Sequence, residues 1–444
     1  MNKIISLFIF VLFFLALPIS SKAESVVVSR KTALDTATKL VEKEEYQDAY
    51  DLLKTFAFDI DTYASERLEI ERLFLIAECL TGLKRYNEAI ALYQQMLDYN
   101  PKLTRIRIEL AHLYFLKEEW YRAEKQYKFA SADEMPADTL QFLNYQRYLA
   151  RKNRKWNAWF SFGVAPDNNI NNAIGGDQCI LTVFGVLCRK LDEPKKAVGY
   201  NVNFGGNYEF GITDGVKLKA ELANDINKYN ISEYDETTTT FSIGPRFSFY
   251  NADIWLAGYY TKDWVDNAEY LSTDGVKLKT LFDFNKSYLW FNNSLSKTSY
   301  DDYPDISVDT YSLNTGYVYN FSSAFYLSLI YNYKHVSTQY APHNENTYGL
   351  GGGYAFNNGL SIDLSWNRLF VKYKKERTYI KNLEIVELKE NDTINNYSIS
   401  LSNRHLDFYG FSPVITYTRQ EKDSNIPERN IDKNLFNITL TRRF

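Results

Sequence analysis

The side chains best suited to specific chemistry are gathered in one short stretch of the sequence. Its residues are Pro166, Asp167, Asn168, Asn169, Ile170, Asn171, Asn172 and Ala173. Proline favours a turn, and Asp and Asn side chains bond to nearby backbone amides and tolerate unusual φ values. The composition alone predicts no more than an ordered loop.

Catalytic motifs are missing from the rest of the sequence. It contains no G-x-S-x-G, no paired-histidine zinc motif, no phosphate loop and no calcium loop. The four histidines, His112, His335, His343 and His405, are scattered along the chain. No histidine is clearly matched with a nucleophile at the same depth on a neighbouring strand. We therefore predict that the chain is not an enzyme and needs no cofactor.

Two of the three cysteines, Cys179 and Cys188, are nine residues apart in a polar connection. In an exported protein such a pair is expected to form a disulfide that closes a small loop. The alternative is a metal site, although no His or other Cys lies nearby to complete it. Cys79 lies in a helical pattern and is expected to be a small buried residue.

The elements that must position the 166–173 loop are strands. Tyr311, Leu313, Tyr317 and Tyr319, for example, alternate with small or polar residues. A period of two, with aromatic residues near the ends of the apolar face, is typical of strands in an outer-membrane β-barrel. We predict fourteen strands, at 156–164, 197–210, 216–228, 237–249, 253–263, 275–284, 287–297, 309–320, 324–336, 346–356, 360–372, 392–402, 406–419 and 433–444.

The predicted connections alternate in length, as they do in such barrels. Those at 251–252, 285–286, 321–323, 357–359 and 403–405 are tight, whereas those at 165–196, 264–274, 298–308, 337–345, 373–391 and 420–432 are long and polar. The short side is the periplasmic side, and an even number of strands leaves both ends of the barrel there.

Composition agrees with a membrane barrel. Aromatic residues make up 16% of the 444 residues, and 36 of them are tyrosines, which suit the membrane–water interface. The formal net charge of −4 gives no basic surface for nucleic acid. After the N-terminus no apolar run reaches the roughly 18 residues that a spanning helix needs.

The N-terminus predicts export. Residues 1–23 have a short basic start, an apolar run, and small residues at Ser21 and Ala23 before a cleavage point, as in a signal peptide. A retained signal anchor is the alternative. Export together with strand alternation predicts the outer membrane of a Gram-negative cell.

Residues 31–150 have helical spacing and a repeat. The pair Tyr86 and Ala89 recurs 34 residues later as Trp120 and Ala123. This period resembles the tetratricopeptide (TPR) repeat, whose stacked helix pairs form a docking surface. We therefore predict a periplasmic TPR-like helical domain at 24–154 and a fourteen-stranded transmembrane barrel at 155–444.

The phase of the repeat indicates which side chains would face a bound client. They are Phe74, Glu78, Arg105, Ile108, His112 and Phe115. The alternative for the two phenylalanines is packing between helices. The basic run at 151–155 is expected to be a solvated hinge at the membrane surface.

The last strand alternates Phe436, Ile438, Leu440 and a terminal Phe444. This pattern resembles the C-terminal signal read by the outer-membrane barrel assembly machinery.

The order of parts, together with the 166–173 loop after a Trp-rich first strand, resembles the surface lipoprotein assembly modulator (Slam) family. The first helical repeat and the cysteine-containing insertion depart from the family pattern. The resemblance implies an outer-membrane translocator that delivers a specific surface lipoprotein, or a soluble relative, from periplasm to cell surface. The TPR domain would capture the client, and the seam between the first and last strands would pass it.

The implied partners are the client lipoprotein, outer-membrane lipid and the barrel assembly machinery, with periplasmic chaperones as further candidates and no nucleic acid. Two alternatives remain, a TPR-barrel exporter of an extracellular polysaccharide and a passive porin. A charged-sugar conduit should have rings of one charge sign. The expected inward positions here are mixed: Lys217 and Lys219 beside Glu221, and Lys277 with Lys279 near Asp283.

Overall fold

The structure is a computed structural model of the chain. It describes residues 29–58, 62–175, 177–182, 185–303, 305–381, 384–403, 405–406, 410–426 and 429–444. The predicted signal peptide, residues 1–23, lies outside the described residues.

The chain divides into two compact units, Met1–Arg85 and Tyr86–Phe444. The first contains helices α2 (Arg30–Glu42), α3 (Tyr46–Lys54) and α4 (Tyr63–Gly82). The second begins with α5 (Tyr86–Tyr99), α6 (Thr104–Leu116), α7 (Trp120–Ala130) and α8 (Ala137–Asn153), and its strands follow. Within the described residues, no helix has the length and apolar character needed to span a membrane.

Small and apolar residues form the contacts inside the helical part. Ala89, Ala111 and Ala123 are 0% exposed, so they lie where the repeat requires small side chains at helix crossings. In the second unit, Tyr127 and Leu143 are equally buried beside them. Helices α5–α8, which we call the cap, therefore have a hydrophobic core of their own.

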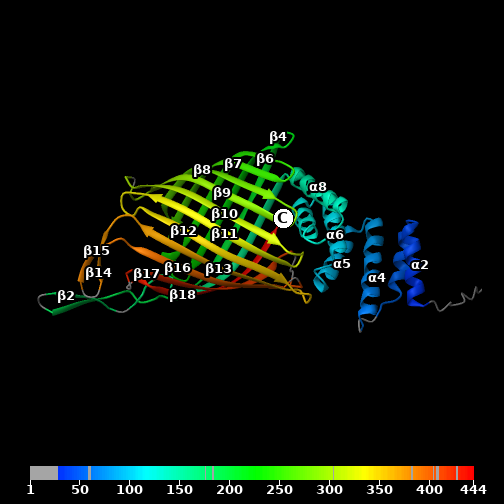
Figure 1. Ribbon diagram of the computed structural model, residues 1–444, viewed down its shortest axis with the longest axis horizontal. Helices are drawn as coiled ribbons and strands as arrows, with labels where there is room; N and C mark the ends of the chain where they lie inside the picture. Colours follow the sequence, from blue (N-terminus) through cyan, green and yellow to red (C-terminus); the bar gives the residue numbers. More distant parts are fainter. Residues whose placement is uncertain are drawn as a thin grey trace, which may run out of the picture. The chain divides into compact units, whose positions relative to one another are not determined.

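Fourteen strands form a closed antiparallel barrel in the order β1-β18-β17-β16-β13-β12-β11-β10-β9-β8-β7-β6-β5-β4 (Figure 1). Their bounds are β1 (Trp156–Asp167), β4 (Ala197–Thr213), β5 (Val216–Tyr229), β6 (Glu236–Ser248), β7 (Ala252–Val265), β8 (Ala268–Asp283), β9 (Ser287–Tyr300), β10 (Ser307–Asn320), β11 (Phe325–Ser337), β12 (His343–Ala355), β13 (Leu360–Tyr373), β16 (Asn391–Asn403), β17 (Ser412–Ser424) and β18 (Ile431–Arg443). The predicted fold, TPR-like helices followed by a fourteen-stranded barrel, is confirmed.

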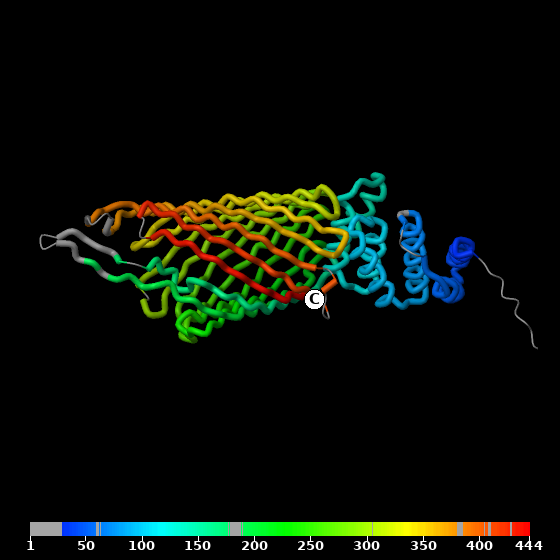
Figure 2. Tube along the Cα trace, turned by 90° about the horizontal axis from the view of Figure 1, so that it is seen from below, coloured from blue at the N-terminus to red at the C-terminus, as the bar shows by residue number. Residues whose placement is uncertain are grey.

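The barrel closes where the first strand meets the last. β1 pairs with β4 on one side and with β18 on the other. Figure 2 shows the red β18 running along β1 at this junction, which we call the seam.

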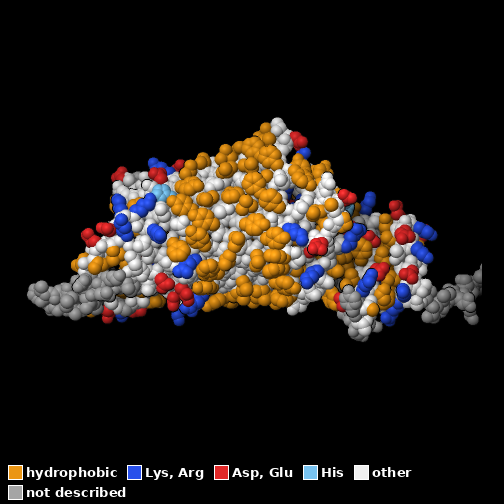
Figure 3. Space-filling model, viewed as in Figure 1, with side chains coloured by type: hydrophobic (Ala, Val, Ile, Leu, Met, Phe, Trp, Pro, Cys, Tyr) orange, Lys and Arg blue, Asp and Glu red, His pale blue; other side chains and the backbone are white. Residues whose placement is uncertain are grey.

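Period-two alternation separates two surfaces of the barrel. Outward residues such as Leu329, Leu350 and Leu364 are more than half exposed. Figure 3 shows apolar side chains spread over the wall of the barrel, with charged side chains gathered toward its ends. An apolar outer wall with a polar interior is the arrangement that lipid on one side and water on the other require.

One predicted connection and one predicted strand are wrong, and two hairpins were not predicted. The predicted long loop at 264–274 is a two-residue turn, because Asp266 and Asn267 adopt positive φ values of 48° and 63° and β8 begins at Ala268. Both residue types tolerate this conformation, which matches the twist of a tight hairpin. The strand predicted at 406–419 lies further along, as β17. The long connections at 165–196 and 373–391 contain two hairpins, β2 (Asp177–Thr182) with β3 (Gly185–Lys190), and β14 (Arg377–Lys381) with β15 (Glu384–Leu388).

Candidate functional site

The cap lies against one end of the barrel, which we call the helix-side rim; the opposite end is the far rim (Figure 1). Short turns between strands form the helix-side rim. Ser131 Oγ donates to the Asn285 carbonyl oxygen at 3.3 Å, and the Ser323 amide donates to Asp133 Oδ1 at 2.9 Å. The cap is therefore bonded to at least two turns of the rim.

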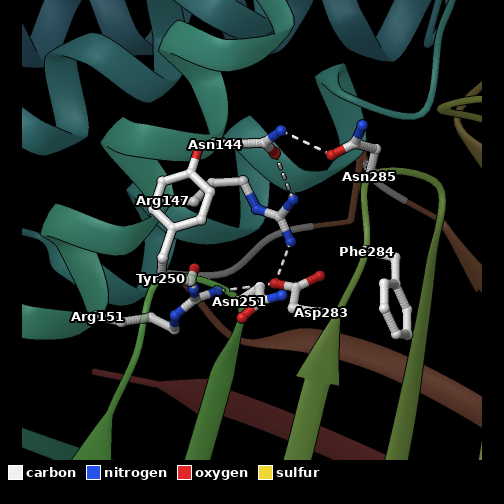
Figure 4. A pocket seen from close by; sticks show the side chains of 8 residues that line it. All are labelled: Asn144, Arg147, Arg151, Tyr250, Asn251, Asp283, Phe284 and Asn285. Carbon is white, nitrogen blue, oxygen red and sulfur yellow. Dashed lines mark hydrogen bonds and ion pairs between the residues drawn. The ribbon is translucent and has the colours of Figure 1, made fainter.

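The strongest contact between cap and rim is an ion network that we call the arginine latch: Arg147 and Arg151 of α8 with Asp283 of β8 (Figure 4). Arg147 Nη2 pairs with Asp283 Oδ2, and Arg151 Nη1 lies 2.7 Å from the same oxygen. Arg151 Nη2 also donates to the Tyr250 carbonyl oxygen at 2.7 Å, and its Nε lies 3.3 Å from Asp253 Oδ2.

Both arginines are buried, with side chains 3% exposed, and the Asp283 side chain is 4% exposed. Burial opposes the charged form of Arg151, but Glu124, Asp253 and Asp283 outweigh it and hold the pKa of Arg151 above its ordinary value. The expectation that 151–155 is a solvated hinge is therefore wrong at its first residue. Separating the partners of a buried ion pair leaves an uncompensated charge, which is costly. The latch is therefore expected to keep its geometry.

A small cavity adjoins the latch. It has a volume of about 240 Å³, and it is lined by Asn144, Arg147, Arg151, Tyr250, Asn251, Asp283, Phe284 and Asn285. In Figure 4 the two arginines converge on Asp283, while Asn144 reaches Asn285 on the next turn. This lining joins α8 to two separate turns of the rim.

Further contacts connect the cap to other parts of the rim. Lys152 Nζ lies 2.6 Å from Asp214 Oδ1 in the β4–β5 turn. Lys217 Nζ donates to the Arg154 carbonyl oxygen at 2.6 Å. Near the end of β18, Arg443 Nη1 donates to the Tyr121 hydroxyl at 2.7 Å. The cap is thus held at several points around the helix-side mouth.

The inner wall carries charges of both signs, as predicted. Glu221 lies 2.9 Å from Lys219, 3.7 Å from Lys279 and 3.8 Å from Lys277. The ammonium of Lys219 lies 3.9 Å from the centre of the Trp255 ring. Opposite charges beside one another do not form the single-sign ring expected of a conduit for a charged sugar.

The seam contains an interruption. Ala158 and Phe444 exchange both backbone hydrogen bonds, so every second residue from Ala158 onward turns its backbone groups toward β18. Pro166 belongs to this set and has no N–H to donate. The register of β1 on β18 accordingly runs from Trp159 to Val164 and resumes at Asp167, whereas β1 on β4 is continuous through Pro166.

A side-chain clasp crosses the seam just beyond this interruption, at the far rim. Lys433 Nζ of β18 lies 2.6 Å from Asp167 Oδ2 and 3.3 Å from Asn172 Oδ1. The Asn434 amide donates to Asn168 Oδ1 at 3.0 Å. Three residues of the 166–173 loop therefore hold the last strand through side chains.

The same loop is ordered by its own amides. Asn169 is 4% exposed; its Nδ2 donates to the Ala173 carbonyl oxygen at 2.7 Å and its Oδ1 accepts from the Ala173 amide at 2.9 Å. Ile170 donates its amide to the Lys195 carbonyl oxygen at 2.9 Å. Asn171 bonds to backbone groups of Glu193 and Lys195. The loop is thus fixed on the seam, but its composition did not indicate Lys433 as its partner.

The residues predicted to bind a client lie in two units. Phe74 and Glu78 are half-buried on α4, in the first unit. In the second unit, α6 carries Arg105, Ile108, His112 and Phe115, all half-buried or exposed.

Two details bear on the alternative for this face. Arg105 pairs with Glu109 at 2.6 Å. The Phe115 ring meets the Trp120 ring edge-on at 5.0 Å, which is packing of the kind the alternative requires. Binding by this face stays a prediction.

The remaining predicted residues are on the barrel and its insertion. Phe436, Ile438, Leu440 and Phe444 are 36–44% exposed along the outer face at the end of the chain, and their role in assembly stays a prediction. Cys188 is disulfide-bonded, and the β2–β3 register places Cys179 opposite it. The side chain of Cys179 lies outside the described part of the chain, so the pairing itself also stays a prediction.

A closed antiparallel barrel with an apolar outer wall defines the class of transmembrane β-barrel proteins of the outer membrane. Residues 156–444 match the family described as Surface lipoprotein assembly modifier, and residues 80–134 match the tetratricopeptide repeat. The chain belongs to the surface lipoprotein assembly modifier family, and it is located in the outer membrane.

Two named relatives support this assignment. A surface lipoprotein assembly modifier of Pasteurella multocida is 20% identical over 382 residues, covering 81% of this chain and 74% of the relative. Surface lipoprotein assembly modifier 1 of Neisseria meningitidis serogroup B is 22% identical over 386 residues, covering 81% and 73%. Among solved structures, the outer-membrane protein OmpT of Vibrio cholerae aligns with 65% of this chain and 98% of its own length, at 7% identity and a TM-score of 0.34.

The family description refers to the assembly of surface lipoproteins and names no catalytic reaction. That the chain itself is not an enzyme remains a prediction. Neither of the two relatives carries a name that refers to polysaccharide export.

Proposed function

We propose that this protein delivers a specific surface lipoprotein, or a related soluble protein, from the periplasm to the cell surface. The observation that carries the proposal is the family match over the whole barrel, residues 156–444. The relatives are named for the assembly of surface lipoproteins, and this chain carries a tetratricopeptide match ahead of the barrel that matches the family.

The helical domain and the barrel would have different roles in delivery. The helical domain at 24–154 would lie in the periplasm and capture the client, because short turns are the periplasmic side of such barrels. The barrel at 155–444 would pass the client outward. The ion network that holds the cap at the helix-side rim supports controlled entry of the client into the barrel. An open porin would not require a buried ion network at its mouth.

The seam supports a sideways exit for a lipid anchor. Its backbone ladder is interrupted at Pro166, and polar side chains close its far end. Opening there would break fewer backbone hydrogen bonds than opening a continuous ladder, so the cost is smaller.

The proposed partners follow from this path. They are the client lipoprotein, outer-membrane lipid along the apolar wall, and the barrel assembly machinery, which would read the pattern from Phe436 to Phe444. Periplasmic chaperones would hold the client before capture.

The direct test is co-expression with a surface lipoprotein of the same organism, scored by protease treatment of whole cells. We expect the client to be cleaved only when this protein is present, while a periplasmic marker stays intact. Equal cleavage of the client with and without this protein would contradict the proposal.

A further inference from the structure

A second pocket lies at the helix-side end of the seam. Its volume is about 780 Å³, and it is lined by Lys117, Glu118, Glu119, Trp120, Tyr121, Arg122, Asn153, Arg154, Lys155, Trp156, Arg442 and Phe444. The lining comes from the α6–α7 turn, the first turn of α7, the end of α8 and the two ends of the barrel sequence that form the seam. The pocket is thus a junction of cap, rim and seam.

The strands contribute the side of the pocket nearest the membrane. On β18, Arg442 continues the outward series formed by Phe436, Ile438 and Leu440. Trp156 is 55% exposed at the start of β1, and Phe444 is 44% exposed. Aromatic residues of this kind favour the level of the lipid headgroups, where one edge of the ring is wet.

The pocket has more positive than negative side chains, because five of the lining residues are basic and two are acidic. Glu119 is already paired with Lys117 at 2.8 Å and with Arg122 at 2.9 Å. Among the described residues, Lys155 and Arg442 have no carboxylate side-chain partner within ion-pair distance. Two basic groups thus remain available to an anion.

Arg442 is held in place without a counterion. Its guanidinium lies 4.3 Å from the centre of the Phe444 ring and 5.6 Å from that of Phe411. A cation held beside two aromatic rings has a fixed position in the pocket and is therefore preorganised for an anionic ligand.

The neighbouring helix experiences the same excess of positive charge. On α7, burial lowers the pKa of Lys125, and Arg443, Arg107 and Arg122 lower it further. The helix-side end of the seam is therefore an electropositive environment.

We propose that this pocket binds the phosphate group of an anionic glycerophospholipid from the leaflet on the cap side of the membrane. Lys155 and Arg442 would hold the phosphate, Trp156 and Phe444 would flank the glycerol, and the acyl chains would lie along the apolar outer faces of β1 and β18. Basic groups beside aromatic ones at the membrane interface are the recognition chemistry for such headgroups. The inference goes beyond the proposed function and does not depend on it.

The test is native mass spectrometry of the full-length protein in micelles that contain equal amounts of phosphatidylglycerol and phosphatidylethanolamine. We expect the unaltered protein to retain phosphatidylglycerol preferentially. The double variant Lys155→Gln/Arg442→Gln should lose the preference, and Arg442→Lys should keep most of it because the charge remains. Excess inorganic phosphate should not displace the lipid, since it lacks acyl chains.

The matched control is Arg368→Gln. Arg368 is exposed on β13, with its guanidinium 5.2 Å from the Phe370 ring, so it is another arginine beside a ring on this barrel. Its replacement should leave lipid retention unchanged. Heat-modifiable migration on gels establishes that each variant is folded.

Three results would overturn the inference: no preference in the unaltered protein, an undiminished preference in the folded double variant, or an equal loss in Arg368→Gln. Displacement of the lipid by inorganic phosphate would also contradict it, because the ligand would then be a free anion. Client display on cells is scored separately. If lipid retention is lost while the client is displayed normally, the proposed function is unaffected. If lipid is retained normally while no client is displayed, this inference is unaffected.

Discussion

The arginine latch and the seam close the same barrel by different means. The latch joins cap to rim through two arginines that share one carboxylate, and all three side chains are at most 4% exposed. The seam joins two strands through backbone hydrogen bonds that stop at Pro166, with an ion pair only at its far end. Loss of Asp283 would leave Arg147 as a buried charge without a carboxylate partner among the described residues, whereas the seam can separate one hydrogen bond at a time.

This difference indicates which closure is suited to move. A buried ion network has a narrow range of acceptable geometries, so the cap is expected to behave as a rigid part of the rim. A short ladder with a proline in it has fewer backbone hydrogen bonds to lose on opening, and the clasp, with side chains 11% and 8% exposed, adds a single ion pair. The comparison therefore places the adjustable element of the barrel at β1 and β18.

The largest effect is expected from Asp283→Asn, which removes the charge that both latch arginines share. Loss of one partner in a buried network costs about 3–5 kcal/mol. Amide hydrogen exchange in α7 and α8 should become roughly a hundredfold to several thousandfold faster, because local exchange follows local stability. Mass spectrometry of peptides from the cap would measure it.

The matched control for the latch is Glu233→Gln. Glu233 pairs with Lys195 at 2.8 Å, but both side chains are about half exposed, so the pair is screened by water. No measurable change in exchange is expected. Unchanged protection of the cap in Asp283→Asn would show that the latch does not hold it.

The clasp should have an intermediate effect that is confined to the seam. Lys433→Met leaves Asp167 without its partner, and a double-mutant cycle with Asp167→Asn should give a coupling energy of about 1–3 kcal/mol. The measurement is the temperature at which the barrel loses its folded migration on gels, together with amide exchange in β1 and β18.

A similar ion pair on another strand pair provides the comparison. Lys422 lies 2.7 Å from Asp392, with side chains 18% and 3% exposed, and it joins β17 to β16. Lys422→Met should loosen that pair and leave the seam protected. If Lys422→Met and Lys433→Met loosen the seam equally, the clasp is not what holds the far end of the seam.

Pro166→Ala should have a smaller effect of opposite sign. Alanine supplies the missing N–H toward Phe436, and one further hydrogen bond is worth about 0.5–1.5 kcal/mol. Slower amide exchange in β18 is expected, together with less client on the surface, because the seam then opens less readily. Faster exchange in β18 would contradict the backbone assignment on which the interruption rests.

A pH dependence at α7 is expected as well. Burial lowers the pKa of Lys128 to about 8 from an ordinary 10.5, although Asp283 raises it in part. Between these two values the unfolded chain binds more protons than the folded one, so stability rises with pH in that window. The melting temperature of the cap should increase from pH 8 to 10, and Lys128→Met should abolish the increase. A melting temperature that falls from pH 8 to 10 in the unaltered protein would contradict this prediction.

Much of the fold followed from the sequence because period-two alternation is strong wherever one face of a strand meets lipid. The predictions failed in segments where no strand face meets lipid. β8 begins seven residues before its predicted start at 275, since outward residues beyond the membrane need not be apolar. The β2–β3 and β14–β15 hairpins lie in the long connections and carry no lipid-facing pattern.

The contacts of the site were harder to predict. Arg147 and Asp283 are 136 residues apart, and no local pattern marks them as partners. Arg151 stood in a basic run that indicated exposure, yet burial against carboxylates decides its environment. The 166–173 loop was singled out correctly as ordered, but its partner Lys433 is 261 residues from Asn172 and comes to it only when the barrel closes.

The most direct test of the account is a covalent lock on the seam. Ser161 faces Thr441 across the seam and Asn203 on the other side of β1. Cysteines at 161 and 441 would lock the seam, and cysteines at 161 and 203 would lock the ordinary β1–β4 pair. Native Cys79 should not interfere, because burial raises its pKa to about 11.

We expect oxidation of the 161–441 pair to abolish protease-accessible client on whole cells, reductant to restore it, and the 161–203 pair to have no effect. Reductant alone on the unaltered protein controls for the disulfide of Cys188. Full surface display from the oxidised 161–441 protein would contradict the conclusion that this barrel works by opening between its first and last strands.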